Sequence, residues 1–141
     1  MNDSMMLNYI RQNLDMGIDG IEKVIPCARG VNFRKALEDQ LSEYRQLNAE
    51  ADHLLALSGG EEKNASAFSK ISADVMTSMK CMTYDEDSKI AEDMIKGTTS
   101  GITKLSRHLG DYDGSNHEVV ELSKKVIGVQ ERNIEEMKNY L

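Results

Sequence analysis

The chain has few of the residues that build β-sandwiches and β-barrels. Among its 141 residues there is one proline, no tryptophan and two phenylalanines, and aromatic residues make up 5%. Sandwiches and barrels draw on aromatic and β-branched side chains and need frequent proline or glycine turns. The composition therefore favours an all-α fold, and the length suits a single domain, residues 1–141, with a sizeable core.

The sequence also lacks an excess of basic residues and any long apolar run. Lys and Arg number 17 against 24 Asp and Glu, and the basic residues are scattered, so no stripe could neutralise a phosphate backbone. No run approaches the ~20 apolar residues of a membrane span, and Asp3 stands where a signal peptide carries a basic residue. We expect a cytoplasmic protein without nucleic-acid or membrane partners.

The two cysteines, Cys27 and Cys81, match no metal-binding or redox spacing. In a reducing compartment such cysteines are more often buried thiols than a disulfide or a zinc site. We therefore expect both to be free and inert.

Apolar residues recur at helical spacing along almost the whole chain. Stop and cap signals divide the pattern into five predicted helices at about 3–27, 32–58, 66–82, 86–109 and 116–141. The four long helices form two hairpins, which a faint repeat at a spacing of 80 residues relates to each other, with Gly17 equivalent to Gly97. The predicted architecture is an antiparallel four-helix bundle in which the additional short helix links the hairpins.

The two hairpins and two glycine-bearing segments resemble uncharacterised bacterial proteins of the ferritin-like superfamily. The segments are 16–21 (Met-Gly-Ile-Asp-Gly-Ile) and 96–102 (Lys-Gly-Thr-Thr-Ser-Gly-Ile). The resemblance implies a ferritin-like bundle. In metal-binding members, a Glu on one helix of each hairpin and a Glu-x-x-His on the other hold a di-iron or di-manganese centre.

Glu50 and His53 form the one literal Glu-x-x-His on the second helix. With Leu47, Ala51 and Leu54 facing the core, Glu50 lies on the flank and His53 points further out, whereas ligands to a buried metal share the inward face. The equivalent segment of the last helix contains no histidine. We expect a bundle without the di-metal ligand set and without a cofactor; the alternative is a di-iron or di-manganese site that includes Glu50 and His53.

Four neutral polar residues fall on the predicted inward faces: Gln40, Tyr44, Thr98 and Gln130. Such groups can hydrogen-bond one another inside a bundle without the cost of burying charge. They indicate either a polar layer that fixes helix register or a pocket for a small ligand. Both interpretations place the four side chains near one another.

Two pairs of glycines lie within helices, at a cost of about 1 kcal/mol each relative to alanine. Gly17 with Gly20, and Gly97 with Gly101, fall on one side of their helices. Close crossing of the first and fourth helices is the favoured explanation, and room for a ligand or a dimer partner is the second.

No phosphate-binding loop is present, and the three histidines belong to no triad motif, so the sequence favours a protein that is not an enzyme. The leading hypothesis is a cytosolic helical bundle that acts through self-association, as a homodimer, or through a protein partner. One alternative is a ferritin-like oxidase or metal-storage protein. A third is a ligand-binding bundle centred on Tyr44 and Gln130, which requires an unfilled polar cavity between the long helices.

Overall fold

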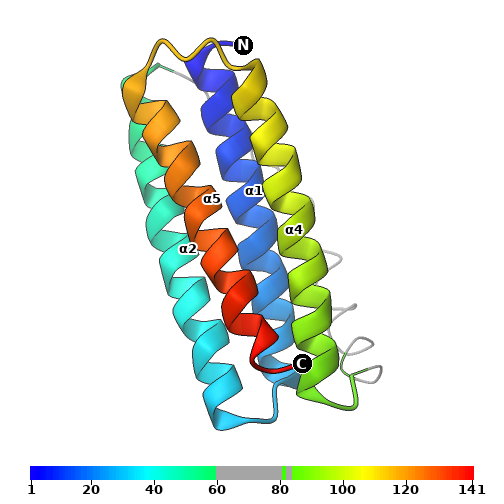
Figure 1. Cartoon of the computed structure of the whole chain (residues 1–141). Helices are drawn as coiled ribbons and strands as arrows, with labels where there is room; N and C mark the ends of the chain where they lie inside the picture. Colours follow the sequence, from blue (N-terminus) through cyan, green and yellow to red (C-terminus); the bar gives the residue numbers. More distant parts are fainter. Residues whose placement is uncertain (60–80, 82–83) are drawn as a thin grey trace.

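The computed structural model describes residues 1–59, 81 and 84–141, and these residues form helices and no strand. The helices are α1 (Asp3–Val24), α2 (Val31–Leu57), α4 (Asp87–Asp111) and α5 (His117–Lys138), with a short 3₁₀ helix, η1 (Ile25–Cys27), after α1 (Figure 1). The predicted all-α class is confirmed. The predicted helix at 66–82 lies outside the described residues except for Cys81.

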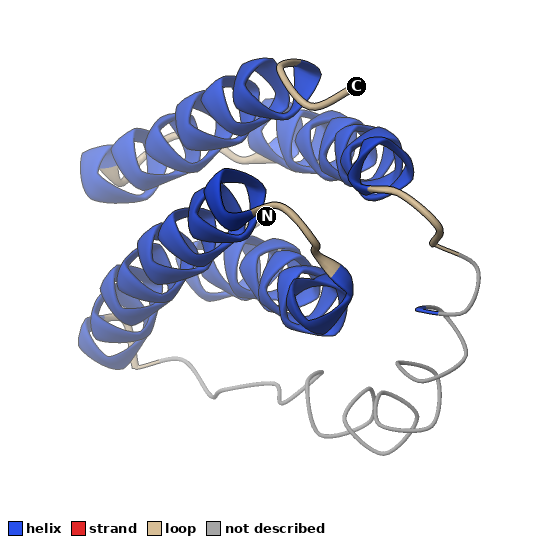
Figure 2. Ribbon diagram, turned by 90° about the horizontal axis from the view of Figure 1, so that it is seen from below, coloured by secondary structure: helices blue, strands red, loops and turns tan. Residues whose placement is uncertain are grey.

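The four helices pack around a common interior (Figure 2). Ser4 lies beside Ser58, and Asn48 Nδ2 donates to Asp15 Oδ1 at 2.9 Å, so α1 and α2 run in opposite directions as a hairpin. α4 and α5 pack on each other after a short connection, and the second pair then packs on the first through α1 with α4 and α2 with α5.

The interior is filled by apolar stripes, one from each helix. On α1 the predicted residues Leu7, Ile10, Leu14 and Ile21 are 0–1% exposed, which at about 1.5–3 kcal/mol for each buried side chain makes α1 a major contributor to the core. The largest fully buried side chains come from all four helices: Phe33, Met6, Leu7, Ile10, Leu14, Ile21, Leu37, Leu55, Ile90, Leu105, Met137 and Val119.

The end of α1 differs from the prediction. The helix stops at Val24, and η1 follows because Pro26 lacks the N–H that would continue the ladder. Here Cys27 forms a disulfide with Cys81, with their Cα atoms 5.2 Å apart, so the expectation of two free thiols is wrong. Their separation of 54 residues hides this proximity from any spacing rule.

Hydrogen bonds to a carboxylate also stabilise this end of the bundle. Asp87, in the first turn of α4, accepts from the backbone N–H groups of Arg29 and Gly30, both at 2.8 Å. Because α1, the turn before α2 and the start of α4 meet here, the disulfide and Asp87 together fix how the second hairpin starts relative to the first.

The inward face of α5 includes polar residues. Val126 and Met137 are buried, as the helical spacing of apolar residues predicts, and Ser123 and Asn133 are buried with them. Leu141, although apolar, is 65% exposed. An apolar pattern cannot reveal Ser123 and Asn133 as interior residues, because both are polar.

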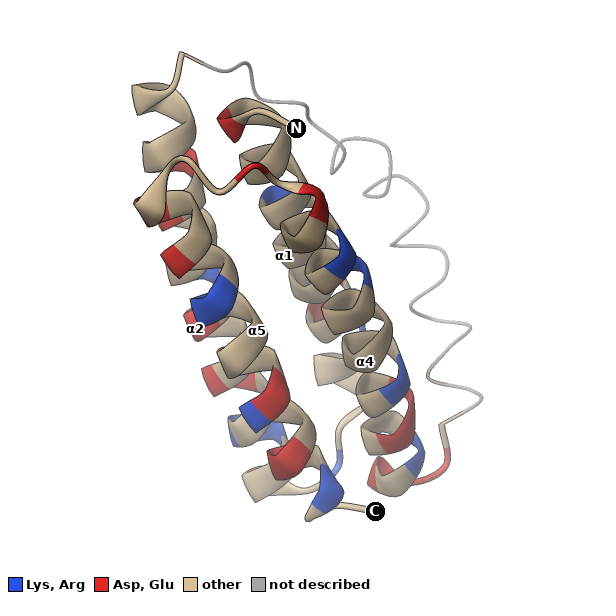
Figure 3. Cartoon of the chain, turned by 45° about the horizontal axis from the view of Figure 1, so that its top comes forward, with Lys and Arg blue, Asp and Glu red and all other residues tan. Residues whose placement is uncertain are grey.

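Acidic and basic residues are interspersed along the helices (Figure 3), and most of those described are exposed. One charge is an exception: Arg11 is buried and forms an ion pair with Asp52 of α2 at 2.6 Å. Within the described ranges, no helix has the length and apolar character that crossing a membrane requires.

Candidate functional site

The middle of α4 does not enter the core. Its buried residues are Ile90, Ala91 and Leu105, and no side chain between Ala91 and Leu105 is buried. The sequence predicts that Thr98 and Gly101 face inward in this stretch. In the structure they face a cleft of about 480 Å³ between α1 and α4.

The cleft is formed mainly by α1 and α4, and α2 and α5 each contribute one residue to its floor. The α1 residues recur at helical spacing from Tyr9 to Val24, and the α4 residues extend from Asp93 to His108. The floor residues are Tyr44 of α2 and Gln130 of α5. Its described lining is Tyr9, Gln12, Asn13, Met16, Gly17, Gly20, Val24, Tyr44, Tyr84, Asp93, Met94, Gly97, Thr98, Ser100, Gly101, Lys104, Leu105, His108 and Gln130.

The four glycines singled out in the sequence all line this cleft, but they play two different parts. A Cβ atom at Gly17 would lie 2.5 Å from Cε2 of Tyr44, and one at Gly101 would lie 3.2 Å from Nδ2 of Asn13. These two glycines make room for a neighbouring side chain. A Cβ atom at Gly20 or Gly97 would meet no described atom within 4 Å, so these two leave open space.

Asn13 joins three helices at the floor of the cleft. Its Nδ2 donates to the carbonyl of Gly101 on α4 at 2.9 Å, and its Oδ1 accepts from Nε2 of Gln130 on α5 at 2.6 Å. Because a backbone carbonyl can only accept, it fixes the orientation of the Asn13 amide and, through it, that of the Gln130 amide. The remaining atom, Gln130 Oε1, is buried and has no hydrogen-bond partner among the described residues.

Tyr44 lies beside this amide chain and is 2% exposed. Burial raises the pKa of its phenol, and the side chains of Asn133, Gln130 and Thr98 near the hydroxyl oppose part of the shift. Tyr44 therefore stays neutral at physiological pH and presents a ring and a hydroxyl to the cleft rather than a charge.

The two ends of the cleft differ in charge. At one end the rings of Tyr9 and His108 stack with centroids 3.6 Å apart, and Lys104 lies one turn before His108. At the other end Tyr84 donates to Asp93 Oδ2 at 2.5 Å. Burial and this carboxylate raise the pKa of Tyr84 to about 12.

Three of the four polar residues singled out in the sequence share this cleft: Tyr44, Thr98 and Gln130. Gln40 does not join them. Its Nε2 donates to Glu136 Oε1 at 2.9 Å, and it lines a separate surface pocket with Glu136. Gln40 lies one turn nearer the start of α2 than Tyr44, which places it beside the last turns of α5 instead.

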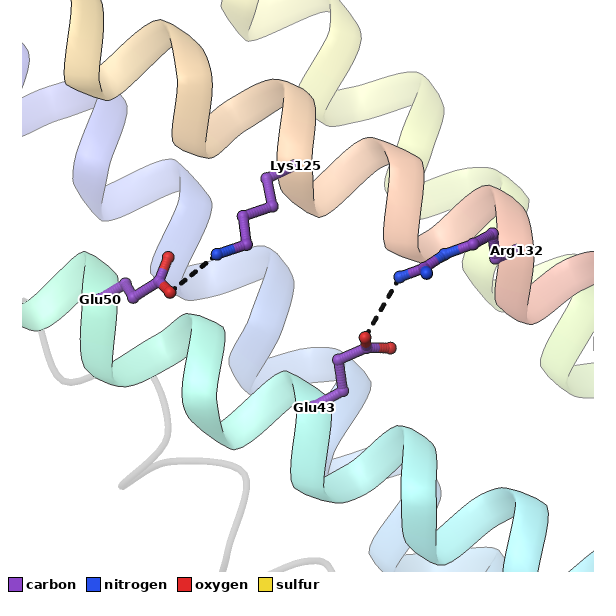
Figure 4. Close-up of polar contacts among 4 residues, drawn as sticks. All are labelled: Glu43, Glu50, Lys125 and Arg132. Atoms are coloured by element: carbon purple, nitrogen blue, oxygen red, sulfur yellow. Dashed lines mark hydrogen bonds and ion pairs between the residues drawn. The ribbon is translucent and has the colours of Figure 1, made fainter.

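Glu50 and His53, the residues of the alternative metal site, lie outside this cleft. Glu50 forms an ion pair with Lys125 of α5 at 2.9 Å, and Glu43 pairs with Arg132 at 3.2 Å two turns away (Figure 4). His53 is exposed. Within residues 1–59, 81 and 84–141, no three His, Cys, Asp or Glu side chains are grouped closely enough to hold a metal ion.

Among the cleft residues that sequence reasoning missed are Tyr9 and Asn13 on α1 and Lys104 and His108 on α4. The signal for the α1 residues was a second stripe, which runs beside the apolar stripe at the same helical spacing and consists of Tyr9, Asn13, Gly17, Gly20 and Val24. The glycines within this stripe were recognisable from the sequence. Asn13 was not, because an asparagine among polar neighbours such as Gln12 and Asp15 is typical of an exposed position.

We compared the chain with protein-family models, with curated proteins and with solved structures, and none of them matches it. The arguments for its function therefore come from its own residues.

Proposed function

We propose that this protein works by binding a small, largely apolar molecule in the cleft between α1 and α4. The observation that carries the proposal is the cleft itself, which has a volume of about 480 Å³ and lies where no side chain between Ala91 and Leu105 of α4 is buried. A concave site of this size with a largely apolar lining is typical of small-molecule binding.

Gly20 and Gly97 support the same proposal. Each lies inside a helix, where glycine is destabilising by about 1 kcal/mol relative to alanine. No described side chain packs against either position, so close packing of helices does not account for them. Open space for a bound molecule does.

Binding is favoured over catalysis by the state of the reactive groups in the cleft. His108 is stacked on Tyr9, and Asp93 accepts from Tyr84. Among the hydrogen bonds of the described lining residues, none joins a hydroxyl nucleophile to a histidine base. We therefore assign no catalytic residue and no cofactor.

The test is titration with N-phenyl-1-naphthylamine, a neutral dye that becomes fluorescent in apolar sites and carries an N–H donor. We expect one dye molecule to bind per chain, and Gly97→Leu, which places a side chain in the cleft, to abolish binding. Gly128→Leu is the matched control, because Gly128 is also a helical glycine with no described atom within 4 Å of its Cβ position, and it does not line this cleft. Absence of dye binding by the folded wild-type protein, or equal loss in both variants, would contradict the proposal.

The expected homodimer is a second, independent proposal. Of the five exposed large apolar residues among the described ones, all but Met16 lie at the two ends of the bundle, with Met5 near Leu57 at one end and Val31 near Leu141 at the other. End-to-end contact between copies would cover them. Light scattering tests this proposal, and a monomer at all working concentrations would overturn it.

We also propose the helix arrangement, the location, the partner and the metal content that the sequence leads us to expect. The two-hairpin, ferritin-like arrangement is supported by contacts between helices of different hairpins. Asn13 of α1 contacts Gly101 of α4, and Glu50 of α2 contacts Lys125 of α5. A cytoplasmic location, a protein partner and the absence of a di-iron or di-manganese centre are proposed with it. Metal analysis of protein purified without chelators addresses the last of these.

A further inference from the structure

The disulfide between Cys27 and Cys81 is close in sequence to two residues that line the cleft. Cys27 follows Val24 by three residues, and Cys81 precedes Tyr84 by three residues. The end of α1 and the start of α4 share one end of the bundle (Figure 1). The bond therefore joins the segment that follows one wall of the cleft to the segment that leads into the other wall.

Tyr84 is the cleft residue whose position depends most on this bond. Residues 84–86 form no helix, so no helical hydrogen bonds fix the backbone there. The Tyr84 ring is 8% exposed, and its hydroxyl donates to Asp93 Oδ2 at 2.5 Å. Asp93 belongs to α4, the helix that the same segment enters. Of the bonds that residues 81 and 84–86 form in the described part of the chain, the disulfide is the one that reaches the first hairpin.

The helix α4 itself has anchors that do not depend on the disulfide. At its start, Asp87 accepts from the backbone N–H groups of Arg29 and Gly30 at 2.8 Å. Beyond its other end, Tyr112 donates to a carboxylate in the first turn of α1. We therefore expect α4 to stay packed when the disulfide opens, and the gain in freedom to fall on the segment that contains Tyr84.

The bond is accessible to a reductant, because both cysteines are partly exposed. A small dithiol supplies the two electrons. One of its thiolates attacks a sulfur of the disulfide and the other cysteine leaves; the second thiol of the reductant then displaces the remaining cysteine. The two protons of the dithiol end on the cysteines, and the reductant becomes a cyclic disulfide. In the cytoplasm, the proposed location of this protein, a disulfide is typically transient or redox-sensing.

We propose that the Cys27–Cys81 disulfide is a redox switch for the cleft, and that the oxidised form holds a bound molecule which the reduced form releases. In the oxidised form the Tyr84 ring is held as part of the cleft lining. In the reduced form the ring is free to leave the lining, so a bound molecule loses an apolar contact and meets water instead. The switch rests on the proposed function, because it states how the same binding site is regulated.

Dye titration of the oxidised and the dithiothreitol-reduced wild-type protein tests the switch. Alkylation and mass spectrometry should find no free thiol in the oxidised protein and two in the reduced one. We expect the reduced protein to keep its helices, as circular dichroism would show, and to bind N-phenyl-1-naphthylamine about threefold to tenfold more weakly. A bond that resists dithiothreitol, equal dye affinity in the two states, or loss of helix on reduction would overturn the switch.

Variants test whether the switch acts through Tyr84. The double variant Cys27→Ser, Cys81→Ser should bind the dye as weakly as the reduced wild type and should not respond to dithiothreitol. Tyr84→Ala should bind weakly in both redox states. Tyr140→Ala is the matched control, a partly buried tyrosine outside the cleft, and should keep the wild-type response. A full redox response in Tyr84→Ala would overturn the role of Tyr84.

The proposed function and the switch fail in different ways. If the oxidised protein binds the dye and Gly97→Leu removes the binding, but complete reduction leaves the affinity unchanged, the cleft is a binding site and the switch is wrong. If the folded, oxidised wild-type protein does not bind the dye, the proposed function itself is wrong, and the switch with it.

Discussion

Replacing glycine by alanine at Gly17 and at Gly20 should shift stability in opposite directions, although the two residues lie three positions apart on one helix. At Gly20 the new methyl group meets no described atom within 4 Å, so only the helix propensity changes. We expect Gly20→Ala to raise the free energy of unfolding by about 0.5–1 kcal/mol.

At Gly17 the same gain in propensity is opposed by a collision. The methyl group would lie 2.5 Å from Cε2 of Tyr44, a ring that is 2% exposed and packed in the interior. Overpacking of this kind costs about 1–3 kcal/mol. Subtracting the propensity gain of about 0.5–1 kcal/mol leaves a net loss centred on about 1 kcal/mol for Gly17→Ala.

Urea unfolding, followed by circular dichroism at a helical wavelength, measures both variants. Because the propensity gain is common to both variants, the account predicts that their free energies of unfolding differ by the overpacking cost, about 1–3 kcal/mol, with the wild type between them. Because Gly17 and Tyr44 both line the cleft, Gly17→Ala should also weaken dye binding. If the two variants were equally stabilised, the close contact between Gly17 and Tyr44 would be refuted.

Further predictions concern the disulfide, the ionisation of Tyr84 and the metal content. Replacing Cys27 and Cys81 by serine should lower the free energy of unfolding by about 2–4 kcal/mol, because the bond closes a long loop; unchanged urea midpoints with and without dithiothreitol would contradict this. The folded pKa of Tyr84 is raised from 10.0 to about 12, so the stability that its neutral phenol contributes is complete below pH 10 and is lost as the pH rises through about 12. Tyr84→Phe should therefore make the fall in stability above pH 10 shallower, as urea unfolding at stepped pH would show, and an unchanged slope would argue against the raised pKa. Protein purified without chelators should contain far less than one iron or manganese per chain by elemental analysis, and about two per chain would restore the di-metal alternative.

The apolar stripes of α1 were predictable because nothing in that helix competes with the period of 3.6 residues. Leu7, Ile10, Leu14 and Ile21 lie in the core where the pattern places them. The face of α5 was not predictable in the same way. There Ser123 and Asn133 are buried, and a rule that sorts residues by hydrophobicity places such polar residues on the surface.

The candidate site was predictable only in part, because its residues become neighbours through tertiary contacts. Tyr44 and Gln130 were recognisable as polar residues on inward faces. Asn13 and Lys104 were not, since each is unremarkable until α1 and α4 are placed side by side. The sequence interpretation also treated charge as a surface property, and Arg11, buried with Asp52 as its partner, shows where that rule fails.

The disulfide also could not be predicted from sequence spacing. Spacing rules identify cysteines that lie close together in the sequence, whereas Cys27 and Cys81 meet because η1 and the chain before α4 lie at the same corner of the fold. Disulfides are typical of oxidising compartments or of redox-responsive proteins in reducing ones. The cysteines therefore no longer support the argument for inert thiols in a reducing cell interior.

The cleft between α1 and α4 is tested most directly by NMR of the methionine methyl groups during titration with N-phenyl-1-naphthylamine. Met16 and Met94 line the cleft, whereas Met5 and Met137 lie outside it. The account predicts intermolecular nuclear Overhauser effects from the dye to the methyl groups of Met16 and Met94, with the signals of Met5 and Met137 unchanged. Contacts from the bound dye to Met5 or Met137, without contacts to Met94, would contradict it.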